Sequence, residues 1–229
     1  MTTSVLCIDG PSGAGKGTIS LRVAERLHWH LLDSGALYRV VGHACVKAGV
    51  PWHDVLGVTA IARQLDVAFD PAADGVCVKL AGEDVTTAIR SEFGGQGASA
   101  VALIPEVRQA LLARQRELAV APGLVADGRD MGTTVFPQAG LKIFLTASAE
   151  ARAKRRQAQL LARGESVSLP RLLEGIEERD ARDSTRDVSP LIAAEDAVNI
   201  DSTNLSIDEV LHRVLTLVTE RGLDTRASD

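Results

Sequence analysis

The chain alternates short apolar runs with longer segments of helical periodicity. The apolar runs predict buried strands over residues 4–8, 28–32, 124–127, 141–145 and 197–200. The periodic segments predict helices over residues 18–27, 36–47, 105–119, 149–163, 170–182 and from 207 up to Gly222. Strands that alternate with helices predict a parallel sheet with helices on both faces, in which the loops after the strands gather along one edge.

Capping residues support several of these helix boundaries. Pro105 suits the first turn of a helix, and Ser148 is a good N-cap for the charged helix that follows it. Gly164 is expected to end that charged helix. Ser206 and Glu209 form a capping box in front of the last helix.

The segment from about 51 to 97 has a different pattern. Residues 67–69 and 76–80 alternate between apolar and polar positions, and Asp74-Gly75 between them is a strong hairpin signal. We therefore expect a small antiparallel sheet inserted into the α/β order.

The richest candidate chemistry lies at residues 8–18, which read I-D-G-P-S-G-A-G-K-G-T between a predicted strand and a predicted helix. Glycines at this place let the backbone N–H groups and the helix N-terminus approach a polyphosphate, and Lys16 adds a positive charge. The pattern predicts a P-loop that binds the phosphates of a nucleotide, assigned as ATP by the resemblance described below. Its residues are Gly10, Pro11, Ser12, Gly13, Ala14, Gly15, Lys16, Gly17 and Thr18.

One position departs from the general P-loop pattern. The residue after the lysine is usually Ser or Thr and binds magnesium, whereas here it is Gly17, followed by Thr18. We therefore expect Mg²⁺ to be held mainly by nucleotide phosphates and water, and we assign no protein ligand to the metal.

Composition narrows the class of protein. The chain has 229 residues, 45% of them apolar, and a formal net charge of −5. One domain with room for an insertion fits this length, and the negative charge disfavours nucleic acid or an anionic membrane as a partner.

Cys7, Cys45 and Cys77 are widely spaced in apolar runs, which favours free thiols in a reducing compartment. With no basic leader or membrane-length apolar run, we expect a soluble cytoplasmic protein.

Further polar residues collect where strands are predicted to end. Ser34, Tyr38 and Arg39 follow the second strand, and Arg129 and Asp130 follow the third. In a doubly wound sheet, ligands bind at this carboxyl edge. These residues therefore predict a second site, which would receive the phosphoryl group.

Two groups of charged residues are less decisive. Arg179, Asp183 and Arg186 share one helical face if the helix extends that far, but spacing alone favours a surface ladder of salt bridges. A second group could be either a solvated face or a cover for the phosphates: Arg152, Arg155, Arg156 and Arg163.

Considered together, the motifs resemble the bacterial cytidylate kinase family. They are the P-loop, D-S-G-A-L-Y-R at 33–39, the hairpin segment, G-R-D-M-G-T at 128–133 and E-R-D-A-R-D-S-T-R at 178–186. The resemblance covers nearly the whole chain. It implies an α/β P-loop three-layer fold with a central parallel sheet, as a single domain over 1–229. It also implies a small antiparallel insert at about 51–97 in the monophosphate-binding region, and a short mobile lid at about 151–164.

The resemblance also implies residue roles. Ser34, Arg39, Arg129 and Arg186 would surround the acceptor phosphate. Arg179 and Asp183 would hold the sugar hydroxyls, and Ser99, Arg108 and Asp130 would contact the base. Tyr38 belongs to the same CMP-binding set. Cytosine offers an N4 amino donor beside two acceptors, so a carboxylate and an arginine are suitable partners for it.

The implied reaction is transfer of the γ-phosphoryl group from ATP, with Mg²⁺, to CMP or dCMP. Lys16, Arg129 and Arg186 would be the catalytic residues, and no general base is assigned because the acceptor phosphate is already anionic. The implied partners are small nucleotides, and a monomer is expected. Other small-molecule P-loop kinases, acting on UMP, AMP, shikimate or a coenzyme precursor, and a nucleotide-binding switch without an acceptor are the competing hypotheses. A panel of acceptors separates them.

Overall fold

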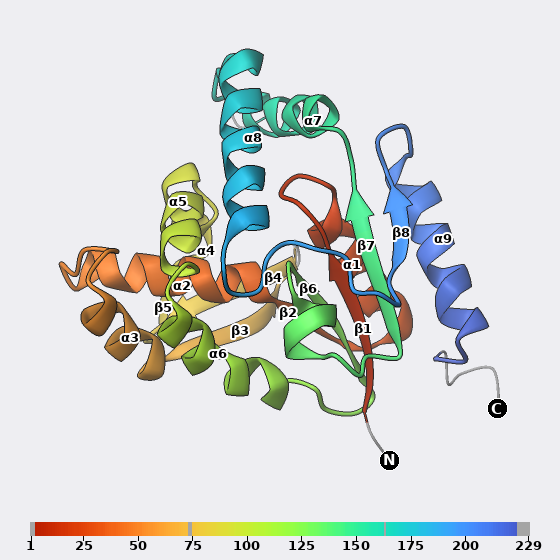
Figure 1. The fold of residues 1–229 in the computed structure, drawn as a ribbon, viewed down its shortest axis with the longest axis horizontal. Helices are drawn as coiled ribbons and strands as arrows, with labels where there is room; N and C mark the ends of the chain where they lie inside the picture. Colours follow the sequence, from red (N-terminus) through yellow and green to blue (C-terminus); the bar gives the residue numbers. More distant parts are fainter. Residues whose placement is uncertain (1–2, 73–74, 163, 224–229) are drawn as a thin grey trace. The chain divides into compact units, whose positions relative to one another are not determined.

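The computed structural model describes residues 3–72, 75–162 and 164–223 (Figure 1). The chain forms two compact units. Met1–Leu32 and Leu118–Asp229 make up the first, called the P-loop unit below, and Asp33–Glu117 make up the second, called the hairpin unit.

The P-loop unit is built on the predicted sheet, whose strand order is β2-β6-β1-β7-β8. The strands are β1 (Ser4–Asp9), β2 (His30–Asp33), β6 (Gly123–Gly128), β7 (Leu141–Thr146) and β8 (Val198–Asp201). β1 pairs in parallel with β6 and β7, and β7 pairs in parallel with β8. Asp9 lies opposite Gly128, so the P-loop and the turn after β6 leave the sheet side by side at one edge.

Four α-helices and one π-helical turn are described in this unit. They are α1 (Lys16–Leu27), α7 (Ala149–Leu161), α8 (Leu169–Thr185), α9 (Ile207–Glu220) and the π-helical turn η1 (Met131–Val135). α1 and α9 pack their apolar residues against the sheet in one core cluster, with Ile19 and Val214 fully buried. This burial stabilises the strand and helix on either side of the P-loop.

The predicted caps are confirmed. Ser148 accepts a hydrogen bond from the Ala151 N–H at 3.2 Å, and Ser206 and Glu209 form the full capping box of α9. α7 ends at Leu161, two residues earlier than the sequence predicted, and Gly164 follows with a φ of 78°. Arg163 lies outside the described residues.

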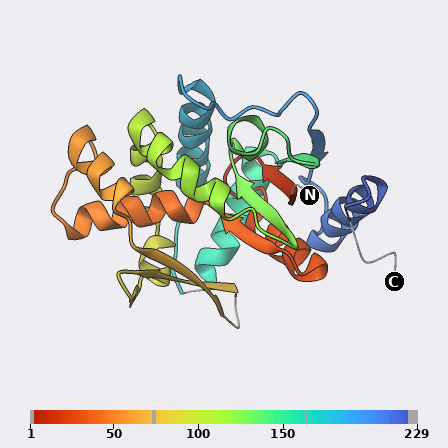
Figure 2. The same ribbon diagram turned by 90° about the horizontal axis from the view of Figure 1, so that it is seen from below.

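The hairpin unit contains the expected antiparallel sheet. Its strands are β3 (Val67–Ala72), β4 (Gly75–Leu80) and β5 (Glu83–Asp84), in the order β3-β4-β5. Val67 pairs with Leu80 and Phe69 with Val78, and Figure 2 shows the two longer strands side by side. Asp74 of the predicted turn lies outside the described residues.

The helices of the hairpin unit include three that the sequence analysis did not predict. The described helices are α2 (Ser34–Lys47), α3 (Val55–Arg63), α4 (Thr86–Ile89), α5 (Glu92–Val101) and α6 (Pro105–Glu117). α3 and α4 lie in the segment from about 51 to 97, for which the sequence predicted only a small antiparallel sheet, and α5 begins in it. In α5, glycines lower helix propensity and hide the signal. Packing requires two of these glycines, because a Cβ on Gly94 would lie 2.4 Å from the Ile89 carbonyl oxygen and a Cβ on Gly97 would lie 2.8 Å from the Trp52 ring.

The three cysteines are free thiols, as the sequence predicted. Cys7 and Cys45 are buried, and burial raises the pKa of Cys45 to about 11. Cys45 is fully buried in the core, and a thiol with a raised pKa is a poor nucleophile. Within the described ranges, no helix combines the length and the apolar character needed to cross a membrane.

Candidate active site

The P-loop has the tight backbone that its glycines predicted. Gly10 has a φ of 148°, and a Cβ at this position would lie 2.0 Å from the Leu145 carbonyl oxygen. No side chain fits there. Gly13 and Gly15 also have positive φ angles, 80° and 99°, which L-residues with a Cβ rarely adopt. The loop is therefore bound closely to the end of β7.

Lys16 lies inside the loop and is only 6% exposed. Its Nζ donates to the Pro11 carbonyl oxygen at 2.9 Å and lies 4.0 Å from Oδ1 of Asp127. Burial lowers the pKa of Lys16 to about 7, and the positive charge of Arg129 contributes to the same shift. A bound polyphosphate would favour the protonated form again.

Ser202, which follows β8, supports the P-loop from behind. Its Oγ lies 3.1 Å from the Ala14 carbonyl oxygen and 2.9 Å from the Thr146 carbonyl oxygen. Arg155 donates to Oγ of Ser202 at 3.1 Å and to the Ala14 carbonyl at 3.4 Å. Arg155 therefore has hydrogen-bond partners at the base of the P-loop. The alternative that it lies on a solvated helix face is wrong. The sequence analysis missed Ser202.

Asp9 fixes the turn after β6 to the start of the P-loop. Its carboxylate accepts hydrogen bonds from the N–H groups of Met131 at 2.9 Å and Gly132 at 2.8 Å. Burial raises the pKa of Asp9 to about 6, although both hydrogen bonds act in the opposite direction. Because Arg129 and Asp130 belong to this turn, Asp9 sets their position relative to the P-loop.

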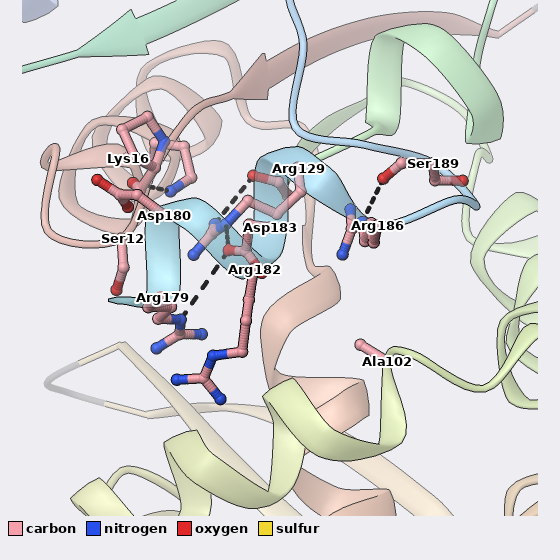
Figure 3. A network of polar contacts seen from close by, with 12 residues as sticks. Ser12, Lys16, Ala102, Arg129, Arg179, Asp180, Arg182, Asp183, Arg186 and Ser189 are labelled. Carbon is pink, nitrogen blue, oxygen red and sulfur yellow. Dashed lines mark hydrogen bonds and ion pairs between the residues drawn. The ribbon is translucent and has the colours of Figure 1, made fainter. Parts of the chain in front are cut away.

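Three residues of the predicted acceptor site meet within the P-loop unit. Oδ2 of Asp183 lies 3.1 Å from Nε of Arg129 and 4.0 Å from Nε of Arg179, and dashed lines join these groups in Figure 3. Arg129 also donates to its neighbour's carbonyl, Gly128, at 3.1 Å. Asp183 is buried, so the surface ladder that spacing alone favoured is wrong for this carboxylate.

Arg186 is not on the helical face of Arg179 and Asp183. α8 ends at Thr185, and Arg186 has an extended backbone with a ψ of 141°. Its Nε donates to the Ser189 carbonyl oxygen (Figure 3). The sequence predicted a shared face only if the helix continued to Arg186. Because α8 ends one residue earlier, that prediction does not hold for Arg186.

Arg152 does not lie on a solvated face, which was one of the two sequence-based alternatives. It is buried, with Nε donating to the Ala147 carbonyl at 2.9 Å. NH1 donates to the Ser12 carbonyl of the P-loop at 3.1 Å and to Asp180 of α8, also at 3.1 Å. This guanidinium is thus part of the internal structure around the loop.

The hairpin unit holds the remaining predicted acceptor residues. Ser34 and Tyr38 are buried in the first turns of α2, and the guanidinium of Arg108 lies over the Tyr38 ring, 5.6 Å from its centre. Arg39 donates to the Ile89 carbonyl at 2.7 Å. Ser99 is partly buried on α5. Within this unit the structure brings Tyr38 and Arg108 together.

The donor groups beside the P-loop can be compared with what a magnesium ion needs. A Cβ on Gly17 would lie 3.5 Å from Oδ2 of Asp127, so this carboxylate faces the site of the usual P-loop hydroxyl. The described residues contain no cluster of three His, Cys, Asp or Glu side chains that could enclose a metal. One carboxylate beside the phosphate loop fits a hydrated ion that is held chiefly by phosphates.

Comparisons with known proteins place the chain in a family. The family model for cytidylate kinase matches residues 6–220. The cytidylate kinase of Stutzerimonas stutzeri (strain A1501) is 57% identical over 221 residues, 96% of each chain, and that of Marinomonas sp. (strain MWYL1) is 53% identical over 220 residues, 96% of this chain and 97% of the relative.

A solved structure shares the fold. It is the crystal structure of an uncharacterized protein from Eubacterium ventriosum. The superposition has a TM-score of 0.53 and covers 95% of this chain and 99% of the other, and the two sequences are 11% identical. At this identity the likeness concerns the fold alone. The family model and the relatives, which match nearly the whole chain, identify the family: the chain belongs to the cytidylate kinases.

Proposed function

We propose that this chain transfers the γ-phosphoryl group of ATP to CMP or dCMP, giving ADP and CDP or dCDP. The observation that carries the proposal is the convergence of positive charge beside the P-loop. The positive charges of Arg129 and Arg179 both lower the pKa of the buried Lys16. The three basic side chains are therefore close enough for their charges to interact. Such a group of cations suits two polyanionic nucleotides better than any neutral ligand.

Catalysis by this site would consist of alignment and charge stabilisation. Lys16 would neutralise the γ-phosphoryl group, and Arg129 and Arg186 would neutralise the acceptor phosphate as the group passes between them. No side chain needs to remove a proton, because the acceptor oxygen is already anionic. The P-loop residues Gly10 to Thr18 would hold the phosphates of ATP through backbone N–H groups.

The acceptor would be held by residues of the three motifs at 33–39, 128–133 and 178–186, together with Ser99 and Arg108. Ser34, Arg39, Arg129 and Arg186 would bind its phosphate, and Arg179 and Asp183 its sugar. Tyr38 would support Arg108 through the contact of their side chains. Arg108, Ser99 and Asp130 would contact the base, with Asp130 accepting from the cytosine N4 amino group. Uracil would place its O4 oxygen against the same carboxylate, which is unfavourable.

Mg²⁺ would be held by the nucleotide phosphates and water near Asp127, and it would supply charge neutralisation on the β- and γ-phosphates. We further propose that residues 51–97 enlarge the monophosphate-binding region of a single kinase domain. Residues 151–164 would act as a short lid that excludes water. The enzyme would work as a cytoplasmic monomer without nucleic acid, in keeping with its net charge of −5 and free thiols.

The test is ADP formation from ATP and Mg²⁺ with CMP, dCMP, UMP, AMP or no acceptor. We expect fast turnover with CMP and dCMP and slow turnover with UMP and AMP. Lys16→Met provides the blank. Hydrolysis of ATP that does not depend on the acceptor would contradict the proposal, and so would equal rates with all four monophosphates.

A further inference from the structure

The guanidinium of Arg152 connects the ATP loop with α8. NH1 donates to the Ser12 carbonyl oxygen at 3.1 Å, and the same nitrogen donates to Oδ1 of Asp180 at 3.1 Å. NH2 donates to Oδ2 of Asp180 at 2.5 Å, which makes the ion pair bidentate. Nε is held by the Ala147 carbonyl at 2.9 Å. One planar group therefore joins the P-loop, the start of α7 and α8.

The geometry makes this connection stiff. The Arg152 side chain is 5% exposed and that of Asp180 is 25% exposed, so solvent screens the pair only in part. A guanidinium is planar and moves as one body, so its bonds to Ser12 and Asp180 cannot change independently. A Cβ on Gly13 would also lie 3.2 Å from Cβ of Arg152, so the loop backbone packs directly on α7.

Asp180 occupies a sensitive position on α8. It directly follows Arg179 and precedes Asp183 by three residues, and these two are the proposed sugar-binding residues. All three lie in one continuous helix, α8 (Leu169–Thr185). A shift or rotation of α8 at Asp180 therefore moves Arg179 and Asp183 with it.

We propose that the Arg152–Asp180 ion pair is a positioning link that couples ATP binding in the P-loop to the orientation of the acceptor-binding residues on α8. Phosphates in the loop fix the Ser12 carbonyl, Arg152 follows the carbonyl, and Asp180 draws α8 into the orientation that binds the acceptor. Arg152 and Asp180 need not touch either nucleotide. The proposal rests on the proposed roles of Arg179 and Asp183.

Coupling of this kind is reciprocal. If ATP improves acceptor binding by some factor, the acceptor must improve ATP binding by the same factor. The factor can be measured by calorimetry as the affinity of a non-hydrolysable ATP analogue with Mg²⁺, in the absence and presence of saturating CMP. We expect about a fivefold or larger improvement in the wild type, at the lower end of typical coupling between sites.

Asp180→Asn is the central variant, because it keeps the shape of the side chain and removes the ion pair. We expect the improvement by CMP to fall to less than about twofold, well below typical coupling. The affinity for the analogue alone should change little. Turnover should fall more than the KM for ATP rises. Asp208→Asn is the matched control, because it breaks the exposed Arg22–Asp208 pair, 2.6 Å long, elsewhere in the same unit.

Several outcomes overturn the proposal. An improvement factor in Asp180→Asn equal to that of the wild type, or no coupling in the wild type, would do so. A purely structural role predicts lower thermal stability with an unchanged factor. If Asp180→Asn fails to fold, Arg152→Lys takes its place. Lysine keeps the positive charge but cannot make the two parallel hydrogen bonds of the guanidinium to Asp180. The improvement of analogue binding by CMP should again fall.

Asp183→Ala separates this inference from the proposed function. If that variant binds and phosphorylates CMP normally, the assigned acceptor site is wrong and the coupling proposal falls with it. If Asp183→Ala weakens CMP use while Asp180→Asn retains the wild-type factor, the acceptor site stands and only the coupling is refuted.

Discussion

Oδ2 of Asp183 lies 3.1 Å from Nε of Arg129, although 54 positions separate the two residues along the chain. One residue comes from α8 and the other from the turn after β6. The proposed sugar-binding and phosphate-binding groups are thus already held together within one unit. Such preorganisation lowers the entropy that is lost when the acceptor is bound.

Asp183→Ala should therefore damage acceptor use in two ways. It removes the proposed sugar contact and releases Arg129 from its partner. We expect kcat/KM for CMP to fall about 100-fold, as for a displaced binding group, while the affinity for ATP changes by less than about threefold, because the P-loop itself is untouched. Steady-state kinetics with each substrate varied would measure both. Asp187→Ala, at an exposed carboxylate nearby, is the control, and a selective loss of ATP binding in Asp183→Ala would refute the assignment.

Asp9→Asn should lower both stability and activity. The Met131 and Gly132 N–H groups each donate to a different oxygen of the Asp9 carboxylate. An asparagine has one oxygen and can accept from only one of them, and its NH₂ group would face the other N–H. One unsatisfied buried donor typically costs about 1–3 kcal/mol. Urea unfolding would measure the cost, and turnover with CMP should fall because the turn that carries Arg129 is less well fixed. Wild-type stability and turnover would contradict this role for Asp9.

The same variant tests the pKa of Asp9, which is raised to about 6. A raised pKa means that the folded state binds this proton more tightly than the unfolded state. The contribution to stability is therefore full below about pH 4, the ordinary range of an aspartate, and it is lost as the pH rises through about 6. We expect the free energy of unfolding of the wild type minus that of Asp9→Asn to decrease over this window. A flat difference would show that Asp9 titrates normally.

Lys16 should take up a proton when ATP binds at alkaline pH. Its pKa of about 7 leaves most of the side chain neutral at pH 8 in the free protein, and the phosphates of ATP raise that pKa. Calorimetry at pH 8 in two buffers of different ionisation enthalpy should give an uptake that approaches one proton. Lys16→Met should lose that uptake. Equal proton uptake by both proteins would assign the effect to another group.

Asp130→Asn should weaken the preference for CMP over UMP. The carboxylate can only accept hydrogen bonds at neutral pH, whereas an amide can also donate to the O4 oxygen of uracil. We expect the ratio of kcat/KM for the two acceptors to fall by about tenfold or more, as for the loss of a base-reading hydrogen bond. An unchanged ratio would remove Asp130 from base recognition.

Local motifs predicted most of the central sheet and of the P-loop. The glycine spacing of the loop, the cap at Ser148 and the capping box at Ser206 each depend on residues that are close in sequence, so they can be recognised without the fold. α5 could not be recognised in this way, because its Gly94 and Gly97 are required by close contacts with Ile89 and Trp52 that only the folded unit reveals.

The contacts that support the candidate site could not be predicted from the sequence either. Arg152 and Asp180 are 28 positions apart, and Asp9 and Gly132 are 123 apart. Spacing along one helix is informative about Arg179 and Asp183 but says nothing about a partner from another element. For the same reason the analysis could not tell that Arg152 is internal, or that α8 ends before Arg186.

The contact between Ser202 and the Ala14 carbonyl, 188 positions apart, has a consequence for synthesis of the protein. The P-loop leaves the ribosome well before Ser202, whose hydroxyl contacts the loop backbone from behind. A nascent chain that stops before β8 lacks this hydrogen bond and the core residues of α9. The P-loop is thus made long before the segments that give it its final surroundings.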